Sequence, residues 1–284
     1  MALFDDVFNR VSIYDMLFFN VKAVLEHPTL GDLEAKDKPM FERWKFISKT
    51  KHNCPVVIYP ITDTFTADIA AVDMQRMNEV YCEHAIKYPE FSKIVAITYA
   101  SLYLDGGSVK RDFKKIVNLD EKLVIDTFMA ELHRLSSEGV QSSPVHFPVL
   151  CGHNVMGYDI PLLIKRYIKL NLRKDEDKEK PVIENKQLPL ILKKCLNTKP
   201  WESSLVIDTT SVWKFNGTDN TPLMLIADYL GLKKTVDVLP LNELSMFYWD
   251  SIDEKPRETL DYVALQSATQ TNLVLQLINE LRQY

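Results

Sequence analysis

One stretch of the chain combines an imidazole, an amide and a carboxylate at close spacing. His153 and Asn154 follow the apolar run 147–152, and Asp159 precedes a second apolar segment that has helical spacing. A carboxylate at such a strand-to-helix corner lies where α/β proteins commonly place their chemistry. Its oxygens can hold a hard divalent cation only if further anionic oxygens lie close by. The stretch therefore predicts either a metal site shared with other carboxylates or a polar binding site.

The hydrophobic pattern predicts the elements that would position this corner. Strands are predicted over 17–24, 93–104, 109–117, 147–152 and 205–208, with the second and third paired as a hairpin. Helices are predicted over 39–49, 72–88, 120–139, 222–230, 241–249 and 257–281, and an irregular or edge-strand excursion over 54–66. This order is typical of an α/β fold with a mixed sheet covered by helices.

No repeat or low-complexity linker divides the sequence, which predicts a single domain over 1–284. Residues 1–13 are expected to form a lead-in, and the highly charged segment 173–187 a surface excursion. The acidic amino terminus and the absence of any apolar run of about 18 residues predict a soluble, cytoplasmic protein without a membrane partner.

Composition and charge restrict which metal sites and nucleic-acid surfaces the sequence predicts. The four widely spaced cysteines predict reduced thiols, two or three of them buried, and no zinc site. A net charge of -5 gives no overall attraction to nucleic acid. The basic segments 43–51 and 110–115 are interpreted as solvated surface, with phosphate contact as the alternative.

The spacing of the central stretch resembles a known motif. His-Asn, three residues, an aromatic-Asp pair, one residue and Pro is the second motif of the DEDD-type 3'-5' exonucleases, and Pro161 completes it here. The resemblance implies an RNase H-like α/β fold with a mixed central sheet flanked by helices. It also implies chemistry in which two divalent metal ions, held between four carboxylates, activate a water and stabilise the leaving oxygen.

A closer resemblance covers residues 14–282. The chain is similar to the bacterial and phage family of predicted 3'-5' exonucleases related to the proofreading domain of family B DNA polymerases. The segments that carry this similarity occur in the family's order: 88–95, 199–202, 208–215, 225–232, and Tyr262 with Thr269.

The chain departs from that family at three of the four carboxylates. The first motif, Asp-x-Glu on a strand, corresponds to Asn20 and Lys22. The third, Tyr followed four residues later by Asp on a helix, corresponds to Tyr262 and Gln266, so only Asp159 remains acidic. An alternative alignment places the first motif at 67–72, with Ala70 replacing the glutamate; the strand at 17–24 is preferred because it has a central-strand pattern.

These replacements change the charge of the site. Asn20 and Gln266 are neutral and Lys22 cancels Asp159, so little remains to attract Mg²⁺. We expect no bound metal. We expect instead that the Lys22 ammonium takes roughly the place of a metal ion and pairs with Asp159.

Plainer roles are available to several of these residues. His153 and Asn154 are candidates for nucleic-acid binding, or they hydrogen-bond the turn. Tyr262 is expected to pack rather than to act in catalysis, and Asp208 either borders the site or caps a helix. The tryptophans are expected mainly in the core rather than as stacking platforms: Trp44, Trp201, Trp213 and Trp249.

Three functions follow from the sequence. The leading hypothesis is a catalytically inactive exonuclease-like protein that binds a single-stranded DNA or RNA end, or a replication or repair protein. The second is a scaffold or inhibitor that contacts only protein. The third is an active exonuclease that uses Mg²⁺ or Mn²⁺ and recruits other carboxylates, such as Asp68 or Asp208.

Overall fold

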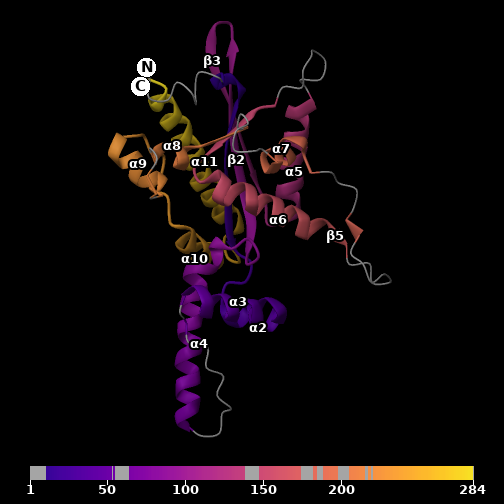
Figure 1. Ribbon diagram of the computed structural model, residues 1–284, viewed down its shortest axis with the longest axis vertical. Helices are drawn as coiled ribbons and strands as arrows, with labels where there is room; N and C mark the ends of the chain where they lie inside the picture. Colours follow the sequence, from indigo (N-terminus) through magenta and orange to yellow (C-terminus); the bar gives the residue numbers. More distant parts are fainter. Residues whose placement is uncertain are drawn as a thin grey trace. The chain divides into compact units, whose positions relative to one another are not determined.

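The structure is a computed structural model, shown in Figure 1, and its residues fall into two compact units. The described residues are 11–52, 54, 64–137, 147–173, 182–183, 188–197, 205–214, 217–218 and 220–283. The first unit comprises Met1–Lys22, Ile94–Leu239 and Arg257–Tyr284, and the second Ala23–Lys93 and Pro240–Pro256. The single domain expected from the sequence stays a prediction.

A five-stranded mixed sheet forms the centre of the fold. Its strands are β1 (Met16–Leu25), β2 (Ser92–Asp105), β3 (Ser108–Val117), β4 (Val149–Gly152) and β7 (Val206–Asp208), in the order β3-β2-β1-β4-β7. β1 runs parallel to β4 and β4 parallel to β7, whereas β2 and β3 form an antiparallel hairpin. The α/β class with a mixed sheet is therefore confirmed, and the carboxyl ends of β4 and β7 lie side by side, next to the middle of β1.

β1 is the central strand, as its apolar sequence predicted. Every residue of it is buried except Asn20, which is half-buried. The strand packs closely against β4 because Gly152 has no side chain. A Cβ atom there would lie 3.2 Å from the carbonyl oxygen of Phe19 and 2.9 Å from the Cβ of Val155. This close approach brings the turn after β4 against the middle of β1.

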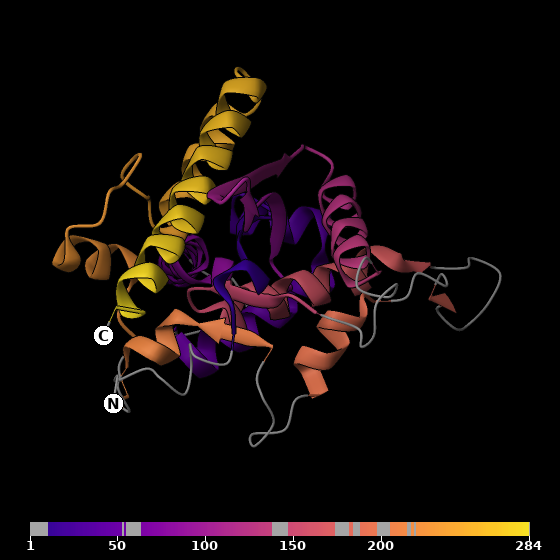
Figure 2. The same cartoon turned by 90° about the horizontal axis from the view of Figure 1, so that it is seen from above.

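Helices of the first unit cover both faces of the sheet (Figure 2). α11 (Pro256–Leu281) lies on one face, where the hydroxyl of Thr98 is 2.8 Å from that of Ser267. α5 (Glu121–Ser137) lies on the other, where the ring of Tyr99 is 5.5 Å from that of Phe128. Neighbouring strand residues thus contact opposite layers, as the alternation of side chains along a strand requires.

Further helices complete these two layers. α6 (Ile160–Asn171) packs on α5 through a buried ion pair in which Arg166 Nε donates to Glu121 Oε1 over 2.8 Å. α8 (Thr209–Trp213) follows β7, and α9 (Leu223–Leu230) shares the apolar cluster that α11 forms with the sheet. Gly231 closes α9 in the left-handed conformation with φ 66°, as predicted. The remaining short elements are α7 (Leu190–Asn197), β5 (Leu172–Arg173), β6 (Val182–Ile183) and the turn η1 (Ile13–Asp15).

The second unit is helical. It contains α2 (Leu30–Lys36), α3 (Lys38–His52), α4 (Thr64–His84), η2 (Ala85–Lys87) and α10 (Leu241–Ser251). Trp44 of α3 is fully buried, with its ring 5.4 Å from Tyr81 and 5.2 Å from Phe91, both edge-to-face. This aromatic cluster is the core of the unit and confirms that Trp44 is a core residue.

The structure corrects part of the sequence prediction. Residues 67–72 lie within α4, so the alternative first-motif strand proposed there is wrong. Residues 55–63 of the predicted excursion lie outside the described residues, as do most of 1–13 and 173–187, and Trp201. Residues 64–66 belong to α4, so the excursion predicted there is wrong. α2, α7 and α8 were not predicted, because segments this short carry little helical periodicity.

Two simpler expectations can also be compared with the structure. All four cysteines are free thiols, and Cys54, Cys151 and Cys195 are buried, as predicted. In the part of the chain that the structure describes, no helix combines the length and the apolar character needed to cross a membrane.

Candidate functional site

Asp208 fixes the turn that follows β4. Its Oδ1 accepts hydrogen bonds from the backbone N–H of Asn154 at 2.8 Å and of Thr210 at 3.0 Å. Its Oδ2 accepts from the N–H of Met156 at 3.0 Å. One carboxylate therefore caps α8 and also joins the end of β7 to the turn after β4. The capping role considered for Asp208 from the sequence is the one seen here, next to the site.

The turn itself has an unusual backbone. Asn154 adopts the left-handed conformation with φ 58°, which asparagine tolerates better than most residues. A Cβ on Gly157 would lie 2.3 Å from the Oδ1 of Asn154, so the glycine leaves room for that side chain. Residues Val155–Asp159 then form one π-helical turn that returns Asp159 to the sheet before α6 begins.

His153 is held by protein groups at both ring nitrogens. Nε2 lies 3.0 Å from the carbonyl oxygen of Thr221 and Nδ1 lies 3.0 Å from the hydroxyl of Thr209. Because a carbonyl only accepts, Nε2 carries a proton. Burial lowers the pKa of His153, with Asp208 opposing it, which favours the neutral ring at pH 7. His153 therefore ties the turn to Thr221, and its candidate role in nucleic-acid binding stays a prediction.

Asp159 lies beside Val21 of β1, where the resemblance places its motif. Its side chain is 3% exposed, and its Oδ1 accepts a hydrogen bond of 2.9 Å from the backbone N–H of Val21. Burial raises the pKa of Asp159 to about 7. The hydrogen bond from Val21 and the charge of Lys22 oppose that rise, whereas the charge of Asp208 adds to it.

Lys22 is the second buried charge of the site. Its side chain is 1% exposed, and burial lowers its pKa to about 8 although attraction to Asp159 acts in the other direction. Among the described residues, however, no direct ion pair joins the two side chains. The expected pairing is thus an electrostatic attraction between two buried groups without direct contact.

Asn20 belongs to a hydroxyl network instead. Its Oδ1 lies 3.0 Å from the hydroxyl of Ser267 on α11. That hydroxyl is 2.8 Å from Thr98, which is in turn 2.7 Å from Thr271. These contacts tie β1 and β2 to α11 at the position where the resemblance predicts the first and third carboxylate motifs to meet.

Gln266 points elsewhere. It is fully buried, donates to the carbonyl of Asp237 at 2.9 Å and accepts from the N–H of Leu239 at 2.8 Å. Tyr262 is half-buried on the same helix. Ser267, rather than its neighbour Gln266, is the residue of α11 that contacts Asn20. The sequence contained one signal for it, since Ser267 and Thr271 are polar residues four apart within an apolar stripe.

The acidic residues of the site are few. Among the described residues, no three His, Cys, Asp or Glu side chains lie together in a group that could hold a metal ion. Asp159 and Asp208 interact through their charges, but the oxygens of Asp208 already accept three backbone hydrogen bonds. What the site offers chemically is a buried, nearly neutral polar cluster of Asn20, Lys22 and Asp159.

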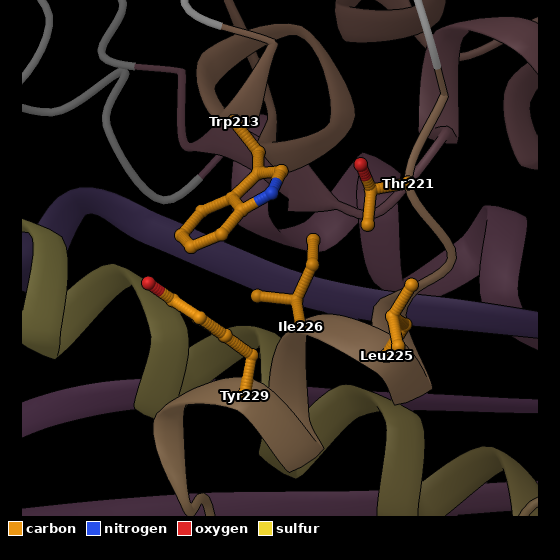
Figure 3. Close-up of a pocket in the computed structure, with 5 residues that line it drawn as sticks. All are labelled: Trp213, Thr221, Leu225, Ile226 and Tyr229. Carbon is orange, nitrogen blue, oxygen red and sulfur yellow. The ribbon is translucent and has the colours of Figure 1, made fainter.

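A pocket adjoins the turn on the side of α8 and α9 (Figure 3). Its volume is about 570 Å³, and its lining residues are Trp213, Thr221, Leu225, Ile226 and Tyr229. Thr221 connects it to the turn, because its carbonyl accepts the hydrogen bond from His153. The sequence predicts no such pocket and predicts Trp213 in the core, but the Trp213 side chain is only half-buried.

Comparison with known proteins adds no assignment: no family model matches the chain, and neither a curated protein nor a solved structure matches it. The function therefore has to be argued from the residues and their geometry.

Proposed function

We propose that the protein is an exonuclease-like member of the RNase H-like fold that has lost its metal site and binds the end of a single-stranded nucleic acid. One observation carries the proposal. In the middle of β1, where the resemblance implies two metal-binding carboxylates, a lysine is buried within electrostatic reach of Asp159. A cation fixed in the protein opposes the binding of a second cation at the same place.

The fold supports the first half of this proposal. The mixed sheet, the central position of β1 and the strand-to-helix corner carrying Asp159 agree with the architecture that the resemblance implies. The carboxyl ends of parallel strands are also the usual ligand-binding edge of α/β sheets. This agreement supports a retained binding function at the carboxyl ends of β4 and β7.

The electrostatics of the site support the proposed loss of the metal site. Two-metal hydrolysis needs several anionic oxygens within a few ångströms of each other. Here Asn20 accepts a hydrogen bond from Ser267, and Asp208 is engaged by the turn and α8. Without those oxygens the chain's residues can orient a strand end by hydrogen bonds, but they do not assemble an activated water.

An active metal-dependent exonuclease remains the second candidate. The charge interaction between Asp159 and Asp208 favours it, because Mg²⁺ or Mn²⁺ bound between the two carboxylates would relieve their repulsion. A protein-only scaffold is the third candidate, and the net charge of -5 favours it over nucleic-acid binding.

A gel assay with 5'-labelled single-stranded DNA and RNA separates these candidates. We expect strand binding that weakens steeply as salt rises, and no shortening in Mg²⁺ or Mn²⁺. The matched control is Asp159→Asn, which keeps an acceptor for the N–H of Val21. Shortening from the 3' end that disappears in Asp159→Asn would establish the active alternative, and absence of both binding and shortening would leave the protein-only scaffold.

A further inference from the structure

The pocket beside the turn is exposed although most of its lining is apolar. Tyr229 is 79% exposed and Leu225 is 60% exposed, both on α9. Ile226, which also lines the pocket, is fully buried in the core cluster together with Leu223. A group of large apolar side chains left on the surface around a pocket commonly marks a binding site. Its volume lies within the usual range of ligand pockets, about 300–1,000 Å³.

Two aromatic rings define one wall of the pocket. The rings of Trp213 and Tyr229 lie 6.2 Å apart with an interplanar angle of 71°, so they meet edge-to-face (Figure 3). This arrangement does not stack one ring on the other, and most of Tyr229 is left open to a ligand. Planar unsaturated groups bind such faces, and nucleobases do so regardless of sequence.

The charge of the segment around the pocket favours a polyanion more than the charge of the whole chain does. The segment 213–234, which carries every lining residue, contains three lysines, Lys214, Lys233 and Lys234, against the two acids Asp219 and Asp228. The whole chain, in contrast, has a net charge of -5. Lys214 follows Trp213 directly, and Lys233 is exposed two residues after the end of α9 at Gly231. Lys234 is paired with Asp228 and Asp237, so Lys214 and Lys233 are the lysines that favour the phosphates of a strand passing the pocket.

The pocket lies close to the elements that carry the polar cluster. α8, which carries Trp213, begins directly after Asp208 at the end of β7. The Thr221 carbonyl is bonded to His153, six residues before Asp159. The pocket and the polar cluster therefore border the same edge of the sheet within the first unit.

We propose that this pocket binds an unpaired nucleobase of a single strand, stacked against Tyr229 and Trp213, while the end of the strand lies at the edge that carries Asp159. This proposal rests on the function proposed above. The base supplies the apolar and π contacts, and the strand's phosphates meet Lys214 and Lys233. The ligand class is thus a single-stranded nucleic acid without a sequence preference, rather than a free nucleotide.

Fluorescence anisotropy with a labelled oligothymidylate tests this. Tyr229→Ala should weaken binding about 5- to 150-fold, which corresponds to the roughly 1–3 kcal/mol of one base–aromatic stack. The matched control is Tyr103→Ala, another exposed tyrosine of the first unit, which should leave the affinity unchanged. An abasic strand of equal length should bind wild type and Tyr229→Ala equally, and circular dichroism checks that each variant is folded.

The outcomes separate the pocket from the function. If wild type binds the strand and Tyr229→Ala binds it equally well, the pocket proposal is wrong and the function proposal stands. If wild type binds no strand, both are wrong. If thymidine monophosphate binds as tightly as the oligomer, or if Tyr229→Ala only abolishes self-association, the pocket serves a free nucleotide or a protein surface, and the proposal is likewise overturned.

Discussion

Lys22 and Asp159 are the residues on which the account depends. Both side chains are almost fully buried, and burial destabilises the charged form of each. Their attraction offsets part of this cost but without direct contact. A buried pair of this kind is expected to be less favourable than apolar or neutral side chains of similar size.

Replacing both charges should therefore stabilise the protein. Lys22→Met with Asp159→Asn removes both charges and keeps an acceptor for the N–H of Val21. We expect the free energy of unfolding at pH 7.5 in urea to rise by about 1–4 kcal/mol. The control pair Lys115→Met with Asp105→Asn, both exposed on the β2–β3 hairpin, should change it by less than about 0.5 kcal/mol. A double variant less stable than wild type would show that the pair stabilises the fold.

The raised pKa of Asp159 makes a second prediction about pH. Between its ordinary value of 3.8 and about 7 the folded protein binds more protons than the unfolded chain. The contribution of Asp159 to stability therefore increases as pH falls from about 7 towards 4. The free energy of unfolding of Asp159→Asn should therefore rise relative to that of wild type between pH 5 and pH 8, when the two proteins are compared at each pH. Equal differences at both pH values would mean that Asp159 titrates normally.

At the scale of elements, the corner formed by β4, β7 and α8 positions the site. Asp208 alone accepts three backbone hydrogen bonds there. We expect Asp208→Ala to lower the free energy of unfolding by about 1–3 kcal/mol, because three backbone N–H groups, one buried and two partly buried, lose their acceptor. Asp208→Asn should lose less, since it keeps one acceptor oxygen. Asp228→Ala, an exposed acid on α9, is the control. An unchanged stability in urea for Asp208→Ala would contradict the role of the carboxylate.

The pairing of α3 with α4 in the second unit is expected to depend on pH. The rings of His52 and His84 stack at 4.5 Å, and burial first, then the charges of His84 and two lysines, lowers the pKa of His52. Since the unfolded chain has the higher pKa, near 6.5, this contribution to stability is present above that pH and is lost as pH falls below it.

Thermal unfolding at pH 5 and pH 7 measures this effect. His52→Gln, which can still bond the hydroxyl of Tyr88, should reduce the loss of stability at pH 5. His133→Gln, an exposed histidine of α5, should leave it unchanged. The same loss at pH 5 in wild type and in His52→Gln would show that another group is responsible.

The sequence predicted long elements better than the contacts at the site. The patterns of β1, β2 and α11 are long and strongly periodic, and the structure confirms all three. Helical periodicity does not distinguish neighbouring residues that are both buried, so it did not show that Ser267 rather than Gln266 contacts Asn20. The π-helical turn at Val155–Asp159 also leaves no periodic signal in five residues. Such details are decided by packing between elements that lie far apart in the sequence.

At the scale of the molecule, charge and chemistry are distributed unevenly. The net charge of -5 argues against general attraction to nucleic acid, while the segment that carries the pocket has a small excess of lysines. A protein that holds a strand end only at one edge needs no more than this local excess. We therefore expect binding of limited extent that weakens as salt rises, without a metal at Asp159.

Titration with Mn²⁺, followed by the electron paramagnetic resonance signal of the free ion, tests the central claim most directly. Wild type and Asp159→Asn are compared at pH 7.5, where two-metal sites are normally filled. If the Lys22 ammonium replaces the metal, both proteins should leave the same amount of Mn²⁺ free at every concentration. A Mn²⁺ site present in wild type and lost in Asp159→Asn would contradict the account.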